Sequence, residues 1–296
     1  MYIINSKKSN KTNTTQDQLN ISQSYLKYIV ENIAIPRHYF AERQNNFKVA
    51  QWIKTEFLSL GLEVYSQGKY NNIIATYKNN QAPYSIIVGA HYDSVPDSFG
   101  ADDNASAVAG MLAVAKALQE YPDISILFIA FNREEDGLLG SQNFVDSLTK
   151  QQIKKTKCVH ILEMIGYCSD QPKSQLVPPN LPVKVDDIGN FIAIIANKYS
   201  NKKLNAIIKI GENKVANLPI KGLKVFLGLE KFFPHLLRSD HAPFWKCKMP
   251  ALMWTDTSEF RNPNYHQTTD TPDTLDYAFM EKVVKLLAYS ILEQVD

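Results

Sequence analysis

Apolar positions in the first quarter of the chain recur every three or four residues, a spacing that predicts amphipathic helices. Pro36 and Gly61 stand where two such stretches end, as expected of residues that stop or cap a helix. Shorter apolar runs follow, with turn-forming residues between them, and these predict a pair of antiparallel strands. The predicted elements are helices at 21–33 and 41–60 and strands at 62–65 and 73–77.

From residue 85 onward, short uninterrupted apolar runs alternate with stretches of helical spacing. Uninterrupted runs are typical of strands that are buried on both faces, as in a sheet covered by helices. The alternation therefore predicts an α/β fold, a three-layer αβα sandwich around a mostly parallel, mixed central sheet. The predicted strands are 85–88, 124–131 and 159–162, and the predicted helices are 105–118 and 138–148.

The second half of the chain has weaker patterns. Residues 168–185 contain four prolines without any period, which predicts a long surface loop. No repeat or linker is visible, so we expect a single domain over 21–296, preceded by a flexible polar leader, residues 1–20. The remaining predicted elements are helices at 187–199 and 277–295 and strands at 204–210, 223–227 and 250–254.

Composition excludes several classes of partner. The net charge is +2, with acids and bases interspersed and no basic stripe, so no nucleic-acid partner is expected. The longest apolar runs are of strand length, well short of the roughly 20 residues of a membrane span, so no membrane partner is expected. The first residues lack the apolar segment of a secretory signal, and the three cysteines show no metal-binding spacing. We therefore expect a cytoplasmic protein, while the oligomeric state stays open.

Polar side chains of metal-binding type follow the predicted buried strands where each strand ends. Sites in open α/β sheets form at the carboxyl ends of the strands, and several carboxylates buried there would be costly without cations to neutralise them. The sequence therefore predicts a metal centre at this edge of the sheet. The strand ends supply His91, Asp93, Glu134, Glu135 and Glu163, and neighbouring loops add Asp102, Asp103 and His266.

Each of these motifs also has an ordinary explanation when it is taken alone. A His-x-Asp sequence such as His91–Asp93 is common in surface and core pairs, and 102–106 has the composition of a helix N-cap. Glu134 and Glu135 fit a solvated turn equally well. At a buried strand end, however, adjacent acids can divide labour, one binding metal and the other acting as a base. The joint occurrence of all the motifs in this order favours a metal-dependent hydrolase.

Six motifs, in the same order, resemble the co-catalytic zinc exopeptidase family that holds bacterial zinc aminopeptidases, glutaminyl cyclases and transferrin-receptor-like proteins. The resemblance runs from about residue 22 to residue 296. The matching segments are Gly89–Ser94, Gly100–Ser106, Glu134–Ser141, Glu163–Tyr167, Ser239–Phe244, and Tyr265–His266 with Asp270–Thr271.

This resemblance implies a pair of zinc ions, with other divalent metals as alternatives. It implies that His91 and Glu163 bind one zinc and that Glu135 and His266 bind the other. Asp102 would bridge the two ions, and the peptide bond between Asp102 and Asp103 would be cis. Aminopeptidases of the family often have Asp where this chain has Glu163, so the reach of that ligand differs from the common pattern.

The resemblance also implies roles for residues that do not bind metal. Glu134 would be the general base that deprotonates zinc-bound water, Asp93 would orient His91, and Tyr265 would stabilise the tetrahedral intermediate. Asp240–His241 would support the site from behind, and Asp270 would support His266.

The implied activity is that of a metallo-exopeptidase, most simply an aminopeptidase acting on peptides. Two alternatives stay open at this stage: a glutaminyl cyclase, which is an acyltransferase, and a receptor-like domain without activity. The cyclase branch typically uses one zinc and lacks the second Asp of the Asp102–Asp103 pair, and inactive relatives lose ligands that this chain keeps. We expect the substrate pocket to be built from 168–185 and 211–238, and its side-chain preference is not predicted.

Overall fold

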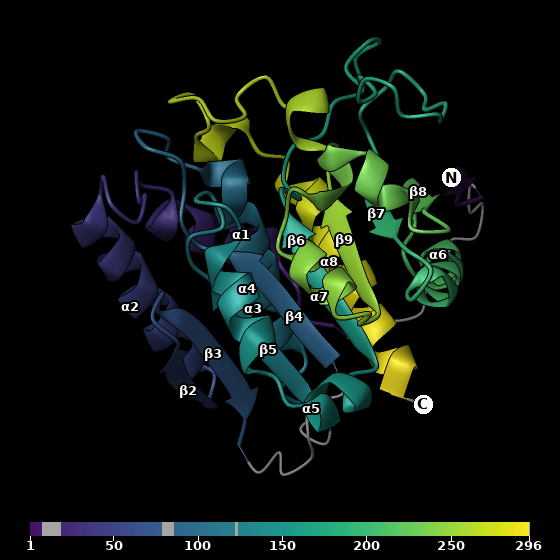
Figure 1. Cartoon of the computed structure of the whole chain (residues 1–296). Coiled ribbons are helices and arrows are strands. Elements are labelled where there is room, and N and C mark those ends of the chain that lie inside the picture. The colour runs from purple at the N-terminus through teal and green to yellow at the C-terminus, as the bar shows by residue number, and fades with distance from the viewer. Residues whose placement is uncertain (8–18, 79–85, 122–123, 296) are drawn as a thin grey trace.

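The computed structural model of the chain describes residues 1–7, 19–78, 86–121 and 124–295. Its strands form one sheet in the order β1-β8-β7-β9-β6-β4-β5-β3-β2, with β2 at one edge and β1 at the other (Figure 1). The strands are β1 (Tyr2–Asn5), β2 (Leu62–Gln67), β3 (Asn72–Tyr77), β4 (Ile86–His91), β5 (Ile126–Phe131), β6 (Cys158–Glu163), β7 (Ile192–Ala196), β8 (Ile220–Lys224) and β9 (Ala251–Thr255).

Parallel pairing occupies the centre of this sheet. β4 pairs in parallel with both β5 and β6, and β6 pairs in parallel with β9. Antiparallel pairs flank this centre: β2 with β3 and β3 with β5 on one side, and β7 with β9 on the other. The predicted mixed sheet and the predicted antiparallel β2–β3 pair are thus confirmed.

Helices cover both faces of the sheet, which confirms the predicted three layers. One hydrophobic cluster joins α1, α2, α3, α6 and α8 to one face, and a second joins α4 and α7 to the other. The helices are α1 (Gln23–Ile33), α2 (Arg43–Ser59), α3 (Ala107–Ala117), α4 (Leu139–Ser147), α5 (Lys150–Lys155), α6 (Asn201–Lys214), α7 (His241–Lys246) and α8 (Tyr277–Val295).

Two predicted elements after residue 186 were wrong. The helix predicted over 187–199 is strand β7, whose five residues Ile192–Ala196 are all apolar and all buried. The strand predicted over 204–210 lies within helix α6, where the buried residues Leu204, Ile207, Ile208 and Gly211 have helical spacing. The spacing of the apolar residues therefore agrees with the structure in α6, whereas the uninterrupted run of β7 fits a buried helix and a buried strand equally.

The first residues of the chain also differ from the prediction of a flexible leader. Residues 2–5 form strand β1, which pairs antiparallel with β8 at the edge of the sheet, and Ile3 lies opposite Leu223. Residues 8–18 of that predicted leader lie outside the described part of the chain. Among the described helices, none has the length and apolar content needed to cross a bilayer.

Candidate active site

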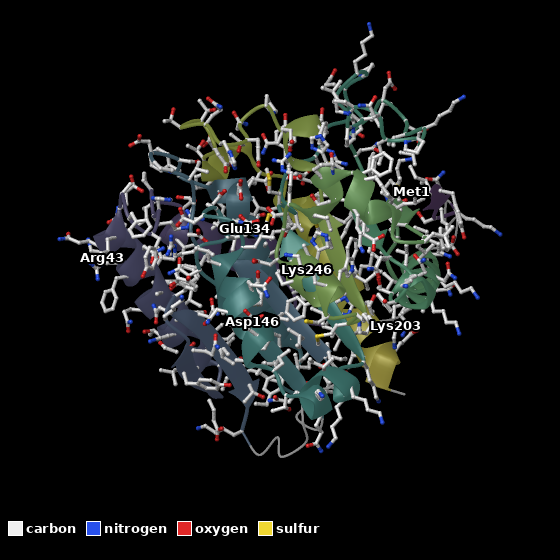
Figure 2. All side chains as sticks on the ribbon, viewed as in Figure 1. Met1, Arg43, Glu134, Asp146, Lys203 and Lys246 are labelled. Atoms are coloured by element: carbon white, nitrogen blue, oxygen red, sulfur yellow. The ribbon has the colours of Figure 1, made fainter. Side chains whose placement is uncertain are left out.

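The parallel centre of the sheet brings the predicted site residues together at one edge. His91 ends β4, Glu163 ends β6, and Glu134 and Glu135 follow β5. Because β4 lies between β5 and β6 and runs parallel to both, the three strand ends are neighbours. Figure 2 shows Glu134 above Asp146 of α4, towards the end of the molecule where the arrowhead of β9 points in Figure 1.

Asp103 occupies the middle of this cluster. Its Oδ1 lies 3.3 Å from His91 Nε2, and its Oδ2 lies 3.2 Å from His266 Nε2. His91 Nε2 is also 3.5 Å from Glu163 Oε2, and His266 Nε2 is 3.4 Å from Glu135 Oε2. The two oxygens of one carboxylate thus face two separate groups of ligands, which is the geometry of a bridging ligand.

Asp102 was predicted to be that bridge, and the structure corrects this prediction to Asp103. The Asp102 side chain turns away from the histidines, where Oδ1 accepts a hydrogen bond from Gly166 N and Oδ2 accepts one from Asn262 Nδ2. The cis peptide bond is likewise displaced by one residue, between Asp103 and Asn104. The segment 101–106 is an irregular helical turn, and the departure of Asp103 from helical φ and ψ separates the two neighbouring carboxylates.

Buried atoms without hydrogen bonds show that this cluster suits metal ions. Among the described residues, His91 Nε2, Asp103 Oδ1 and Glu135 Oε1 are buried and have no hydrogen-bond partner. Buried polar atoms are costly in that state, so their convergence indicates a ligand that they hold in common. Groups of three donors from these residues lie within 4.8 Å of one another, namely His91, Asp103 and Glu163, and Asp103, Glu135 and His266. Imidazole and carboxylate donors of this kind suit zinc.

Electrostatics supports the same interpretation. Burial raises the pKa of Glu135 to about 7, and repulsion from Asp103 adds to the effect. Burial also raises the pKa of Glu134 well above its usual range, against the opposing charge of His91. Carboxylates crowded in this way are stabilised in their charged form by nearby cations.

Asp93 contacts two parts of the site, His91 and the turn that carries Glu134 and Glu135. Its Oδ1 lies 3.5 Å from His91 Nδ1, whose nearer contact is the Asp93 carbonyl oxygen at 3.1 Å. The same carboxylate accepts hydrogen bonds from the backbone N–H groups of Glu134 and Glu135. Asp93 therefore contacts His91 through both its carbonyl and its carboxylate, and it also fixes the turn that carries the adjacent glutamates.

Tyr265 lies beside the cluster and is held by an arginine. Its ring stacks on His266 with the ring centroids 3.7 Å apart, and its hydroxyl accepts a hydrogen bond of 2.7 Å from Arg238 Nη2. Arg238 in turn pairs with the carboxylate of Glu259. Because the tyrosine oxygen accepts from a guanidinium, its own proton is left to donate towards the site.

Several supporting residues were not found from the sequence. Ser239 Oγ donates to Glu163 Oε2 at 2.7 Å, although the sequence motif drew attention only to Asp240 and His241. Asp270 was expected to support His266, but its carboxylate accepts from the backbone N–H groups of 102 and 103 instead. This correction gives Asp270 the task of shaping the turn that separates the two neighbouring aspartates.

Arg37 was missed altogether. It is fully buried and donates to the carbonyl oxygens of Tyr92, Phe99 and Gly100, so it ties the chain after α1 to the loop that leads to Asp103. Burial lowers its pKa to about 10, against the raising effect of Asp270 and other nearby carboxylates. A lone arginine after a proline carries no sequence signal that would distinguish it from a surface residue.

A cavity of about 490 Å³ opens beside the cluster. It is lined at one end by Asp103, Glu134, Glu135, Glu163 and His266. Elsewhere its walls come largely from 175–185 and from 221–238, which lie within the two ranges, 168–185 and 211–238, that we expect to build the substrate pocket. A cavity of this size is typical of sites for small molecules or parts of peptides.

Comparison with known proteins identifies similar sequences. The sequence profile of peptidase family M28 matches residues 72–291. The uncharacterized protein YfbL of Escherichia coli (strain K12) is 34% identical over 300 residues, which cover 95% of this chain and 89% of that protein. Aminopeptidase YwaD of Bacillus subtilis (strain 168) is 30% identical over 243 residues, which cover 80% of this chain but only 47% of the relative, so the chain spans about half the length of this named aminopeptidase.

Solved structures share the fold at lower identity. The LapA aminopeptidase of Legionella pneumophila matches with a TM-score of 0.73 and 20% identity, over 97% of this chain and 76% of that one. The glutaminyl cyclase of Porphyromonas gingivalis matches with a TM-score of 0.67 and 18% identity, over 93% and 99% of the two chains. At such identities these two similarities concern the fold alone.

Proposed function

The chain belongs to peptidase family M28, and from this premise we propose that it is a two-zinc aminopeptidase that removes N-terminal residues from peptides. One observation carries the proposal: the carboxylate of Asp103 faces His91 with one oxygen and His266 with the other, while Glu134 lies beside both groups. The choice of the amino terminus is supported by the relative YwaD, which is named an aminopeptidase.

The proposed ligands form two sets that share Asp103. His91 and Glu163 would hold one zinc ion, and Glu135 and His266 the other. When bound, the ions would polarise the scissile carbonyl and make water acidic enough to be deprotonated near neutral pH. Glu163, which is one methylene longer than the common Asp, is held in place by Ser239.

Glu134 is the proposed general base. It takes a proton from the attacking water and later gives a proton to the nitrogen of the leaving peptide as the C–N bond breaks. Its backbone is fixed by Asp93, and burial raises the pKa of its side chain, so it holds a proton more readily than an exposed glutamate does.

Tyr265 is the proposed donor to the oxyanion that develops on the scissile carbonyl. The hydrogen bond from Arg238 orients the phenol and leaves its proton free to be donated. A donor aimed at the position where charge develops contributes typically 10²–10³-fold to kcat, by the magnitude of single oxyanion donors.

The experiment is a panel of aminoacyl-4-nitroanilides and unblocked dipeptides, assayed with zinc and after chelation. We expect hydrolysis that disappears with chelator and returns with zinc. The matched variant Glu134→Gln removes the base but keeps the side-chain size, so it should lose hydrolysis and retain metal content by mass spectrometry.

Other products would contradict the proposal. A peptide with N-terminal glutamine that yields pyroglutamate, rather than free glutamine, would identify a cyclase. Release of C-terminal residues from N-blocked peptides, with the anilides and unblocked dipeptides left intact, would identify a carboxypeptidase. Protein that binds no zinc under any of these conditions would exclude the two-zinc mechanism.

A further inference from the structure

The cavity extends far beyond the proposed catalytic residues, across the face of five strands. Its floor begins at Glu163 on β6 and continues with Met253 on β9, Ile195 on β7, Leu223 on β8 and Ile3 on β1. The last four residues lie opposite one another in the sheet register, so they form one row across the strands. We call this floor and the space above it the apolar groove.

A loop, rather than a long helix, forms the roof of the apolar groove. The second hydrophobic cluster includes residues of α4 and α7 on this sheet face, and Leu181 and Val183 of the loop pack against the same cluster. Leu176, Pro178 and Val185 line the same cavity from this loop. Apolar side chains of both the sheet and this loop therefore line the cavity.

The length of the apolar groove exceeds that of any single amino-acid side chain. Four inter-strand steps separate β6 from β1 in the sheet order. At about 4.8 Å per step the groove spans roughly 19 Å of sheet. An extended chain advances about 3.3–3.6 Å per residue, so this distance corresponds to roughly five residues.

Three polar side chains that line the apolar groove, Gln175, Thr257 and Lys221, are already engaged within the protein. Gln175 donates to Thr257 Oγ1 and accepts from Arg261 Nε, and Lys221 pairs with Asp186 at 2.6 Å. The strand backbones beneath are engaged in the sheet. A peptide would bring an N–H and a C=O for every residue, and burying these without partners is costly. A hydrocarbon chain has no such requirement.

We propose that the apolar groove binds a long hydrocarbon chain attached to the scissile carbonyl, and that the protein hydrolyses N-acyl amino acids with long acyl chains. The inference rests on the proposed function, because it uses the same base, Glu134, and the same metal ligands. The acyl carbonyl lies at the catalytic end, and the chain runs over β9, β7 and β8 to Ile3.

The reaction needs only water as a second reactant. The oxygen of water bonds to the acyl carbon, the amide C–N bond breaks, and the proton taken by Glu134 passes to the leaving nitrogen. The products are a fatty acid and a free amino acid. No oxidant or reductant is involved.

Binding is measured first, in the Glu134→Gln variant loaded with zinc, so that the substrates stay intact. The ligands are acetyl-, octanoyl-, dodecanoyl- and hexadecanoyl-leucine, titrated by calorimetry. Each buried methylene is worth up to about fourfold in affinity, so we expect dodecanoyl-leucine to bind at least about tenfold more tightly than octanoyl-leucine. Affinities that do not depend on chain length would overturn the proposal, as would an apolar pentapeptide that binds as tightly as dodecanoyl-leucine.

Two variants then test where the acyl chain of the ligand lies in the groove. Ile3→Trp narrows the far end of the groove and should reduce the preference for hexadecanoyl- over dodecanoyl-leucine. Ala193→Phe, on β7, should also reduce the preference for dodecanoyl- over octanoyl-leucine. Tyr2→Trp is the matched control, because Tyr2 is the neighbour of Ile3 on β1 and stacks on Phe226 instead. The control should keep the preferences of the parent protein.

Unchanged preferences in both groove variants, with zinc content and unfolding temperature retained, would overturn the assignment of the groove. The parent protein, which retains Glu134, is then assayed for hydrolysis of the same N-acyl leucines. If the protein hydrolyses aminoacyl-anilides but binds the N-acyl leucines without any effect of acyl-chain length, the proposed function stands and the assignment of the groove is wrong. If binding depends on acyl-chain length but neither substrate class is hydrolysed, the groove binds a hydrocarbon chain and the proposed function is wrong.

Discussion

At the scale of single residues, one backbone turn determines which of Asp102 and Asp103 points towards the histidines of the site. The two side chains are chemically identical neighbours, and the sequence contained no feature that distinguished the bridging one. The structure directs Asp103 to His91 and His266, whereas Asp102 meets Gly166 and Asn262. The residue types of the site were predictable from strand ends and motif order, but the direction of each side chain depended on contacts with distant residues such as Asp270.

This difference gives a direct test with isosteric variants. Asp103→Asn replaces one of the two carboxylate oxygens by an NH2 group and removes the negative charge that both proposed metal positions share. We therefore expect the zinc content measured by mass spectrometry to fall well below that of the parent protein. Asp102→Asn should retain zinc, since its carboxylate makes hydrogen bonds away from the histidines. The reverse outcome would restore Asp102 as the bridge.

Tyr265 and Arg238 form a second testable pair. Tyr265→Phe removes the proposed oxyanion donor, and kcat should fall roughly 10²–10³-fold with a small change in KM. Arg238→Met leaves the phenol in place without the donor that orients it, so we expect a smaller loss, roughly tenfold, also in kcat. The rates are measured with an aminoacyl-anilide, and Tyr265→Phe combined with Arg238→Met should be no slower than Tyr265→Phe alone. Additive losses would mean that Arg238 acts independently of Tyr265.

At the scale of elements, Arg37 links the chain between α1 and α2 to the segments that follow β4. Its guanidinium donates to the carbonyls of Tyr92, Phe99 and Gly100, of which the Gly100 carbonyl also accepts from the backbone N–H of residue 105. One buried side chain thus connects the segment between the two N-terminal helices to the loop that leads to the candidate active site.

Replacing Arg37 with Met should therefore destabilise the protein. Buried carbonyl groups left without donors cost about 1–3 kcal/mol each, so the free energy of unfolding should fall by roughly 3 kcal/mol or more in urea titrations. Lys27→Met is a suitable control, because Lys27 is exposed and pairs with the exposed Glu31 at 3.7 Å. That exposed pair should contribute well under about 1 kcal/mol. Equal effects of the two variants would contradict the structural role of Arg37.

The elements themselves were predictable where the apolar pattern was strong. The strand ending at His91, the strand ending before Glu134 and the strand ending at Glu163 were all located from uninterrupted apolar runs. The exchange of helix and strand at β7 and α6 had another cause. A run of five apolar residues suits a buried helix and a buried strand equally, and only the neighbouring strands β8 and β9 decide between them.

At the scale of the whole molecule, we expect the cluster of buried carboxylates to make the stability of the fold depend on the proposed metal ions. The acids at this edge repel one another, and burial together with that repulsion raises the pKa of Glu135 to about 7. Binding that is restricted to the folded state stabilises it by mass action.

Zinc removal should therefore lower the unfolding temperature. With zinc at about 100 times its dissociation constant, the stabilisation is about 2.7 kcal/mol. At roughly 2–4 °C per kcal/mol for a chain of this size class, chelation should lower the midpoint by about 5–10 °C in calorimetry. Asp103→Asn should show little further shift with chelator, whereas Asp102→Asn should respond as the parent protein does. A midpoint that is insensitive to chelator would contradict a metal centre that stabilises the fold.

The two halves of the site differ in their access to solvent. The side chains of His91 and Glu163 are only 1% and 11% exposed, whereas that of His266 is 35% exposed. An ion held by His266 would exchange with the medium faster than an ion held by His91. Brief dialysis against cobalt should therefore label one position before the other, which would give each half of the centre its own spectroscopic signal.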